Sequence, residues 1–140
     1  MRGLRNYVFD SFAVIAFYAD EPGADTVEKL LVECACGRAE GLISVVNWGE
    51  VFYSVSRVMG EKRALEVVEE MEHLPLAIVD ADKKLTLEAA RLKARYRIAY
   101  ADCFALALAK LKGAFLVTGD PEFRRTDEGV EFVWLPQRGG

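Results

Sequence analysis

Five short apolar runs, separated by segments of helical character, constrain the fold of this 140-residue chain more than any other feature of its sequence. Each run is almost continuously apolar and does not alternate with polar residues, which is typical of strands buried on both faces. Strands that alternate with helices predict an α/β fold, a three-layer sandwich whose parallel five-stranded sheet is covered on both sides. The runs are residues 4–9, 42–46, 76–80, 114–118 and 131–135.

The segments between these runs are expected to form helices that pack on the two faces of the sheet. Asp82 is expected to cap the helix that follows it. Because no repeat, low-complexity stretch or linker divides the chain, residues 1–140 are predicted to form a single domain. The expected helices are residues 11–19, 24–37, 48–59, 61–73, 82–96 and 97–113.

Composition limits the partners and the cellular location that are expected for this chain. Its net charge of −4 argues against a protein that holds nucleic acid by charge alone. Charged residues interrupt the apolar runs too often for a membrane span, and the N-terminus does not resemble a signal peptide. Three cysteines give no disulfide framework, so a cytoplasmic location is expected.

Two of these cysteines, Cys34 and Cys36, have a spacing that raises the question of a zinc site. Zinc requires about four sulfur or imidazole ligands, and His73 is the only histidine in the sequence. Small buried thiols are therefore the favoured interpretation of the cysteines.

Four acidic residues stand at positions that a parallel sheet would bring to one edge. Asp10 and Asp120 directly follow the first and fourth predicted strands, Glu50 begins the helix after the second, and Asp102 begins the helix before the fourth. All four positions map to the carboxyl edge of the sheet. If the first and fourth strands are neighbours, the crevice between them is the expected ligand position.

Each acid also has a purely structural interpretation. Asn47 and Glu50 have capping-box spacing, Asp10 and Asp102 suit helix N-caps, and Asp120 suits a turn before a proline. None of these explanations requires four acids at one edge, however. Crowded carboxylates repel one another and raise one another's pKa, and a divalent cation such as Mg²⁺ or Mn²⁺ relieves that repulsion.

Two hydroxyl residues, Ser11 and Thr118, lie next to these acids in the sequence. Their side chains are candidates to orient the carboxylates or water bound to a cation. The alternative is that each hydroxyl only satisfies nearby backbone groups.

Three segments that carry these acids resemble PIN-domain ribonucleases, and most closely the VapC-type toxins of prokaryotic toxin–antitoxin pairs. The resemblance implies a sheet of strand order 3-2-1-4-5 and cleavage of single-stranded or looped RNA that depends on Mg²⁺ or Mn²⁺. It also implies a small antitoxin as partner. The segments are "NYVFDSFAVIAFYADEPGADTVEKLL", "SVVNWGEVFYSV" and "RYRIAYADCFALALAKLKGAFLVTGDPEF".

The acidic positions of the family carry over to four residues of this sequence, and its hydroxyl position matches Thr118. Asn47 stands where Ser or Thr is commoner in the family. The acidic positions are Asp10, Glu50, Asp102 and Asp120.

The expected chemistry is metal-assisted hydrolysis of a phosphodiester bond. Asp10, Asp102 and Asp120 are the candidate metal ligands, while Glu50 either binds the metal through water or helps deprotonate the nucleophile. Two pairs of arginines are candidates for phosphate contacts, although Glu88 is placed to pair with the first of them. The arginines are Arg91, Arg95, Arg124 and Arg125.

The helix expected at residues 48–59 is apolar on more than one side, as a helix buried on more than one side would be. This pattern predicts a homodimer, and full burial within the fold is the alternative. Two other functions compete with the nuclease. One is a catalytically silent PIN-like scaffold that binds RNA or protein. The other is a receiver-type signalling domain with Asp80 as phosphoacceptor, although the lysine that a receiver needs after its last strand is missing.

Overall fold

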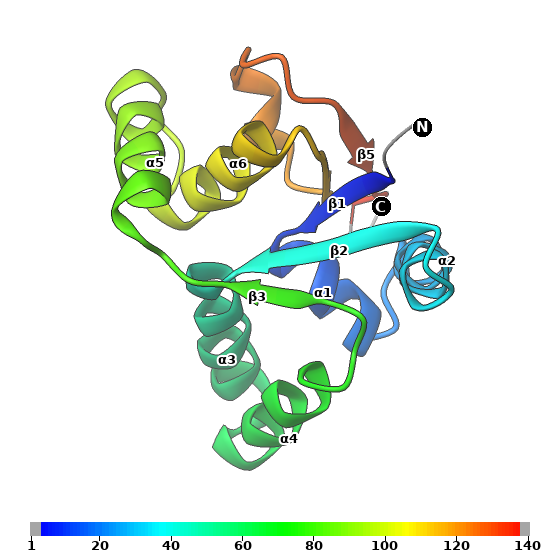
Figure 1. Ribbon diagram of the computed structural model, residues 1–140. Helices are drawn as coiled ribbons and strands as arrows, with labels where there is room; N and C mark the ends of the chain where they lie inside the picture. The colour runs from blue at the N-terminus through cyan, green and yellow to red at the C-terminus, as the bar shows by residue number, and fades with distance from the viewer. Residues whose placement is uncertain (1–3, 138–140) are drawn as a thin grey trace.

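Five strands form one fully parallel sheet in the computed structural model, which describes residues 4–137 (Figure 1). The strand order is β3-β2-β1-β4-β5, which confirms the predicted α/β fold and its topology. The outermost residues of the expected single domain, 1–3 and 138–140, lie outside the described residues. The strands are β1 (Arg5–Phe9), β2 (Ala39–Ser44), β3 (Ala77–Val79), β4 (Phe115–Thr118) and β5 (Phe132–Trp134).

Six α-helices cover the two faces of this sheet, four on one side and two on the other (Figure 1). Helices α1 (Ser11–Tyr18), α2 (Ala24–Ala35), α3 (Val45–Met59) and α4 (Glu61–Met71) pack on one face. Helices α5 (Lys83–Arg95) and α6 (Tyr100–Lys112) pack on the other. A 3₁₀ helix, η1 (Pro121–Arg125), joins β4 to the segment before β5.

Each central strand contributes to both cores because successive side chains point to opposite faces. In β1, Phe9 belongs to the core under α1–α4, whereas its neighbour Val8 belongs to the core under α5 and α6. Both side chains are fully buried. This double burial explains why the strands appear in the sequence as continuous apolar runs.

The boundary between β2 and α3 differs from the sequence prediction. The strand was expected to continue to residue 46, but it ends at Ser44 and the helix begins at Val45. The Ser44 hydroxyl accepts a hydrogen bond of 3.2 Å from the backbone amide of Val46 and thereby caps the helix. Asn47 and Glu50 therefore lie inside α3, and the capping-box interpretation of this pair is wrong.

Helix α6 is buried almost all round, since every residue from Asp102 to Ala109 is buried, with Asp102 the most exposed of them at 7%. It ends at Gly113, whose positive φ of 60° closes the helix in the left-handed region. Among residues 4–137, no helix combines the length and the apolar character that crossing a bilayer requires.

The apolar side chains of α3 divide into a buried set and an exposed set. Val51 and Val55 are buried within the fold, whereas Tyr53, Val58 and Met59 are exposed, Val58 to 84%. Full burial of this helix within the fold, the alternative to a dimer, is therefore wrong for its second half.

Candidate metal centre

The four predicted acids lie on or beside four different elements at the carboxyl edge of the sheet. Asp10 follows β1, Glu50 lies in α3, Asp102 lies in the first turn of α6, and Asp120 follows β4. Strands β1 and β4 are neighbours, which meets the condition set for the expected ligand position at this edge.

Electrostatics shows how closely these acids are coupled. The pKa of Asp10 is raised to about 8, chiefly because the carboxyl group is buried. The hydrogen bonds from Thr118 and Ala13 lower this pKa, and the charges of Asp102 and Glu50 raise it. Burial also raises the pKa of Asp102 to about 7, with contributions from Asp120, Glu50 and Glu122. Two carboxyl groups therefore resist ionisation at neutral pH, because they are desolvated and face other negative charges.

Asp10 both caps a helix and interacts with the other acids at this edge of the sheet. Its Oδ1 accepts a hydrogen bond of 2.9 Å from the Ala13 amide at the start of α1. Its Oδ2 accepts a hydrogen bond from the Thr118 hydroxyl. The capping interpretation is thus correct for Asp10 without excluding a functional one.

The Thr118 hydroxyl links two acids, since it donates to Asp10 and accepts a 3.1 Å hydrogen bond from the Asp120 amide. The other hydroxyl candidate, Ser11, is half-buried at the first position of α1. Within residues 4–137 the Ser11 side chain makes no hydrogen bond to any of the acids.

Asp102, Asp120 and Glu122 each offer a carboxylate oxygen, and these three oxygens lie within 4.8 Å of one another. Glu122 was not predicted from the sequence. Asp120 caps η1 by accepting a 2.9 Å hydrogen bond from the Glu122 amide, so this tight turn brings the two acids together. An acid two residues after a strand-terminal aspartate was the signal that could have identified it. Asp102, in contrast, does not cap α6, because the N-cap is Ala99.

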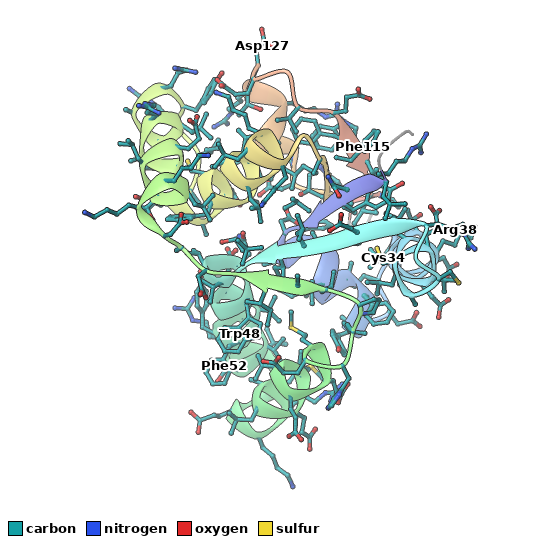
Figure 2. The ribbon with its side chains drawn as sticks, viewed as in Figure 1. Cys34, Arg38, Trp48, Phe52, Phe115 and Asp127 are labelled. Atoms are coloured by element: carbon teal, nitrogen blue, oxygen red, sulfur yellow. The ribbon has the colours of Figure 1, made fainter. Side chains whose placement is uncertain are left out.

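The donor set fits a hard divalent cation. The cluster consists of carboxylate oxygens, which Mg²⁺ and Mn²⁺ prefer. No group that includes a cysteine or histidine meets the same distance criterion within the described part of the chain. Cys34 is half-buried beside β2 (Figure 2) and Cys103 is buried, but Cys36 is exposed, so the expected burial of this thiol is wrong.

The four candidate phosphate-binding arginines differ in their partners. Arg91 pairs with Glu88 at 3.4 Å, as the alternative interpretation predicted, and Arg95 pairs with Glu128 at 2.7 Å. Arg125 lies 3.5 Å from Glu122 of the acidic cluster. The Arg124 guanidinium lies 4.1 Å from the centre of the Trp134 ring. Of the four, Arg124 alone has no carboxylate partner within residues 4–137.

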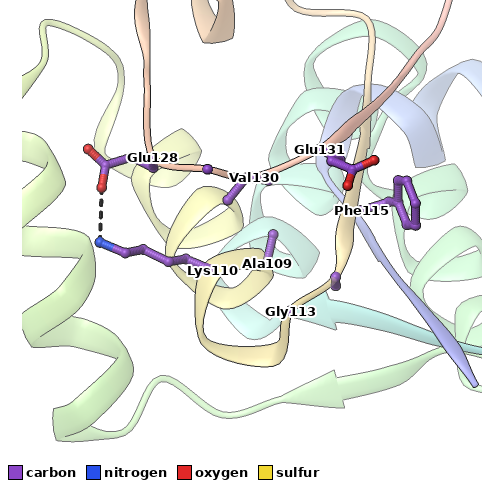
Figure 3. Close-up of a pocket in the computed structure, with 9 residues that line it drawn as sticks. Ala109, Lys110, Gly113, Phe115, Glu128, Val130 and Glu131 are labelled. Atoms are coloured by element: carbon purple, nitrogen blue, oxygen red, sulfur yellow. Dashed lines mark hydrogen bonds and ion pairs between the residues drawn. The ribbon is translucent and has the colours of Figure 1, made fainter. Parts of the chain in front are cut away.

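A pocket between the C-terminal end of α6 and the segment before β5 lies at the opposite edge of the sheet (Figure 3). At the rim of this pocket Lys110 forms an ion pair with Glu128, with 2.9 Å between Nζ and Oε1. Glu128 also accepts a 2.6 Å hydrogen bond from the Tyr96 hydroxyl. Burial raises the pKa of Glu128, but these hydrogen bonds and that of Arg95 outweigh it and hold the pKa near 2. The ionised Glu128 and the side chains that donate to it form a group separate from the acids at the carboxyl edge.

The topology excludes the receiver alternative. Receivers of the CheY type have strand order 2-1-3-4-5, which makes the third strand central. Here β3 is an edge strand, and Asp80 at its end is exposed.

Residues 7–129 match the family model of the PIN domain, and the chain therefore belongs to the PIN-domain family. Similar proteins within this family are ribonucleases of the VapC type. The Ribonuclease VapC of Mycolicibacterium smegmatis is 32% identical over 130 residues, which cover 86% of this chain and 95% of that protein. Ribonuclease VapC30 of Mycobacterium tuberculosis is 32% identical over 136 residues, which cover 92% and 99%.

Solved structures share the fold at lower identity. VapBC2 from Rickettsia felis, bound to a DNA fragment from its promoter, superposes with a TM-score of 0.71 at 19% identity over 93% of this chain and 98% of the matched chain. VapC20 of Mycobacterium tuberculosis, a sarcin-ricin loop cleaving toxin, superposes with a TM-score of 0.66 at 17% identity over 86% and 93%. At these identities the likeness establishes the fold.

Proposed function

We propose that this protein is a divalent-metal-dependent endoribonuclease and the toxin of a toxin–antitoxin pair. The observation that carries the proposal is the convergence of Asp102, Asp120 and Glu122, whose carboxylate oxygens lie within 4.8 Å of one another. Asp10 joins them through Thr118. The similarity to VapC ribonucleases over most of the chain supports the same conclusion.

In this proposal Asp102, Asp120 and Asp10 hold Mg²⁺ or Mn²⁺, and Glu122 is a further ligand from the same turn. The cation, when bound, activates water for attack on phosphorus and stabilises the charge that develops. Thr118 fixes the Asp10 carboxylate by donating to Oδ2. Glu50 either binds the metal through water or accepts a proton. Ser11 remains a candidate for orienting the Asp10 end of the site.

The substrate that suits this centre is single-stranded or looped RNA. The cation offsets the repulsion between the acidic cluster and the phosphate chain. Arg124 is the favoured phosphate contact because no carboxylate neutralises it within the described residues, and Trp134 holds its guanidinium in place. Arg91, Arg95 and Arg125 are less suitable, since each lies beside a carboxylate.

Two protein partners complete the proposal. The exposed side chains of Tyr53, Val58 and Met59 support a homodimer that buries the second half of α3. Several structural neighbours are complexes of a VapC with its VapB, which supports a small antitoxin as the other partner. The setting proposed for the protein is the cytoplasm, with residues 1–140 as a single domain.

Cleavage of a labelled single-stranded RNA, followed on a denaturing gel, tests the activity. Wild-type protein is expected to cut in Mn²⁺ or Mg²⁺ and to stop in EDTA, and Asp102→Asn is expected to lose about 100-fold in rate. Asp80→Asn is the matched control, because Asp80 lies at the same sheet edge but is exposed at the end of β3, and it should stay within about twofold.

Cleavage by Asp102→Asn at the wild-type rate would remove this acid from the site and point to a contaminating nuclease. RNA binding without cleavage by the wild-type protein would instead favour the silent scaffold.

A further inference from the structure

Asn47 is a buried polar residue for which the proposed chemistry does not yet account. It lies in the first turn of α3, three residues before Glu50, and its side chain is completely inaccessible to solvent. Buried amides are normally hydrogen-bonded through both nitrogen and oxygen, so its partners are informative.

The amide nitrogen of Asn47 connects two parts of the acidic site. Nδ2 donates a 3.3 Å hydrogen bond to Glu50 Oε1 and a 3.0 Å hydrogen bond to the carbonyl oxygen of Ala101. Ala101 directly precedes Asp102 in the first turn of α6. One amide therefore holds the Glu50 carboxylate and the backbone that carries Asp102.

Two donated hydrogen bonds use both protons of the amide nitrogen, and this explains why an amide suits the position. A Ser or Thr hydroxyl has one proton and can donate only one hydrogen bond. The orientation of the amide is also fixed, because a flipped group would place its oxygen against the Glu50 carboxylate and the Ala101 carbonyl.

The amide oxygen, in contrast, has no donor. Asn47 Oδ1 is buried and has no hydrogen-bond partner within residues 4–137. A buried acceptor without a partner is costly, so the two hydrogen bonds that Nδ2 donates are what hold the side chain in this orientation.

We propose that Asn47 is a positioning residue of the metal centre, which aims the Glu50 carboxylate and fixes the turn that carries Asp102. This inference rests on the proposed function, because it requires a divalent cation at the acidic cluster. It assigns to Asn47 an outer-shell position, where partners of ligating groups typically change metal affinity 10- to 100-fold.

Binding of Mn²⁺ without RNA tests the proposal. Free Mn²⁺ is measured by electron paramagnetic resonance during titration of the purified protein, and the melting temperature of each metal-free variant confirms folding. Asn47→Ala is expected to raise the Kd for Mn²⁺ at least about tenfold. Asn47→Ser, which keeps one donor and an acceptor, is expected to raise it less.

Asn6→Ala is the matched control. The Asn6 amide also donates to a backbone carbonyl of α6, that of Lys112 at 3.2 Å, but at the far end of the helix. Its Kd for Mn²⁺ should remain within about twofold of the wild-type value.

Two results would overturn the inference, and they are distinct from failure of the nuclease proposal. A lower melting temperature for Asn47→Ala with an unchanged Kd would show a merely structural residue. If Asn47→Ala does not fold, a wild-type Kd in Asn47→Ser would contradict the proposal equally. Absence of Mn²⁺ binding by the wild-type protein would instead overturn the metal centre itself.

Discussion

The Thr118 hydroxyl shows how single residues determine the geometry of this site. By donating to Asp10 and accepting from the amide of Asp120, it fixes two acids that are 110 positions apart in the chain. Its side chain is fully buried, so no solvent competes for these hydrogen bonds. This order has an energetic cost, because the Asp10 carboxyl group is buried and other acids act on it.

That cost predicts how the stability of the metal-free protein depends on pH. The pKa of Asp10 is about 8 and that of Asp102 about 7 in the folded protein, against 3.8 for an unperturbed aspartate. Between about pH 4 and pH 8 the folded state therefore binds more protons than the unfolded state, and the free energy of unfolding falls as pH rises. We expect the melting temperature in EDTA to decrease from pH 5 to pH 8.

Saturating Mg²⁺ should restore much of the lost stability at pH 8, because the cation replaces the protons. Asp10→Asn, which is neutral at every pH, should show a flatter decrease. A melting temperature in EDTA that rises between pH 5 and pH 8 would contradict the assignment of these acids to one desolvated cluster.

At the scale of elements, the site depends on how closely the end of β4 approaches α1. Gly119 stands between Thr118 and Asp120, and a Cβ atom there would lie 2.3 Å from Cε1 of Phe12 in α1. The absence of a side chain at residue 119 therefore permits the end of β4, which carries Thr118 and leads into Asp120, to pack against α1.

Gly119→Ala is accordingly expected to lower the free energy of unfolding by about 1–3 kcal/mol, the usual cost of overpacking. It should also weaken Mn²⁺ binding, since Phe12 and the β4 end must separate. Gly49→Ala is the control, because within residues 4–137 its added Cβ would meet nothing within 4 Å beyond its chain neighbours and its own helix backbone. In mid-helix this substitution should stabilise the protein by about 1 kcal/mol. Urea unfolding measures both, and an unaltered stability of Gly119→Ala would contradict this view of the packing.

Much of this arrangement could be predicted from the sequence, and the exceptions have physical reasons. The continuous apolar strands predicted the parallel sheet. A common edge was predicted because Asp10 and Asp120 directly follow strands and Asp102 begins the helix that leads into the fourth strand. The start of α3 was missed because Val45 and Val46 extend a β-branched run, while the cap is a serine one position earlier.

Other features were hidden because they depend on three-dimensional contacts. Glu122 looks like an ordinary turn acid until η1 turns it toward Asp102. The ion pair of Arg95 joins residues 33 positions apart, so no local spacing could have assigned Glu128 as its partner. The orphaned oxygen of Asn47 likewise becomes visible only when every buried donor is located.

At the scale of the whole molecule, exposed apolar surface on α3 predicts how two copies associate. Val58→Asp would place a charge in the proposed dimer interface, so it is expected to shift the protein from dimer to monomer. Leu87→Asp, at an exposed leucine on α5, is the control and should leave the dimer intact. Sedimentation velocity distinguishes the outcomes, and a wild-type monomer or a dimer unaffected by Val58→Asp would contradict the proposed interface.

Calorimetric titration of the metal-free protein with Mn²⁺ at about pH 6.5, in two buffers of different ionisation enthalpy, tests the metal centre most directly. Because the pKa values of Asp10 and Asp102 are about 8 and about 7, both groups are largely protonated there and must release protons when the cation binds. We predict saturable binding accompanied by release of about one proton or more, and loss of both signals in Asp102→Asn. Absence of binding, or binding that neither releases protons nor depends on Asp102, would contradict it.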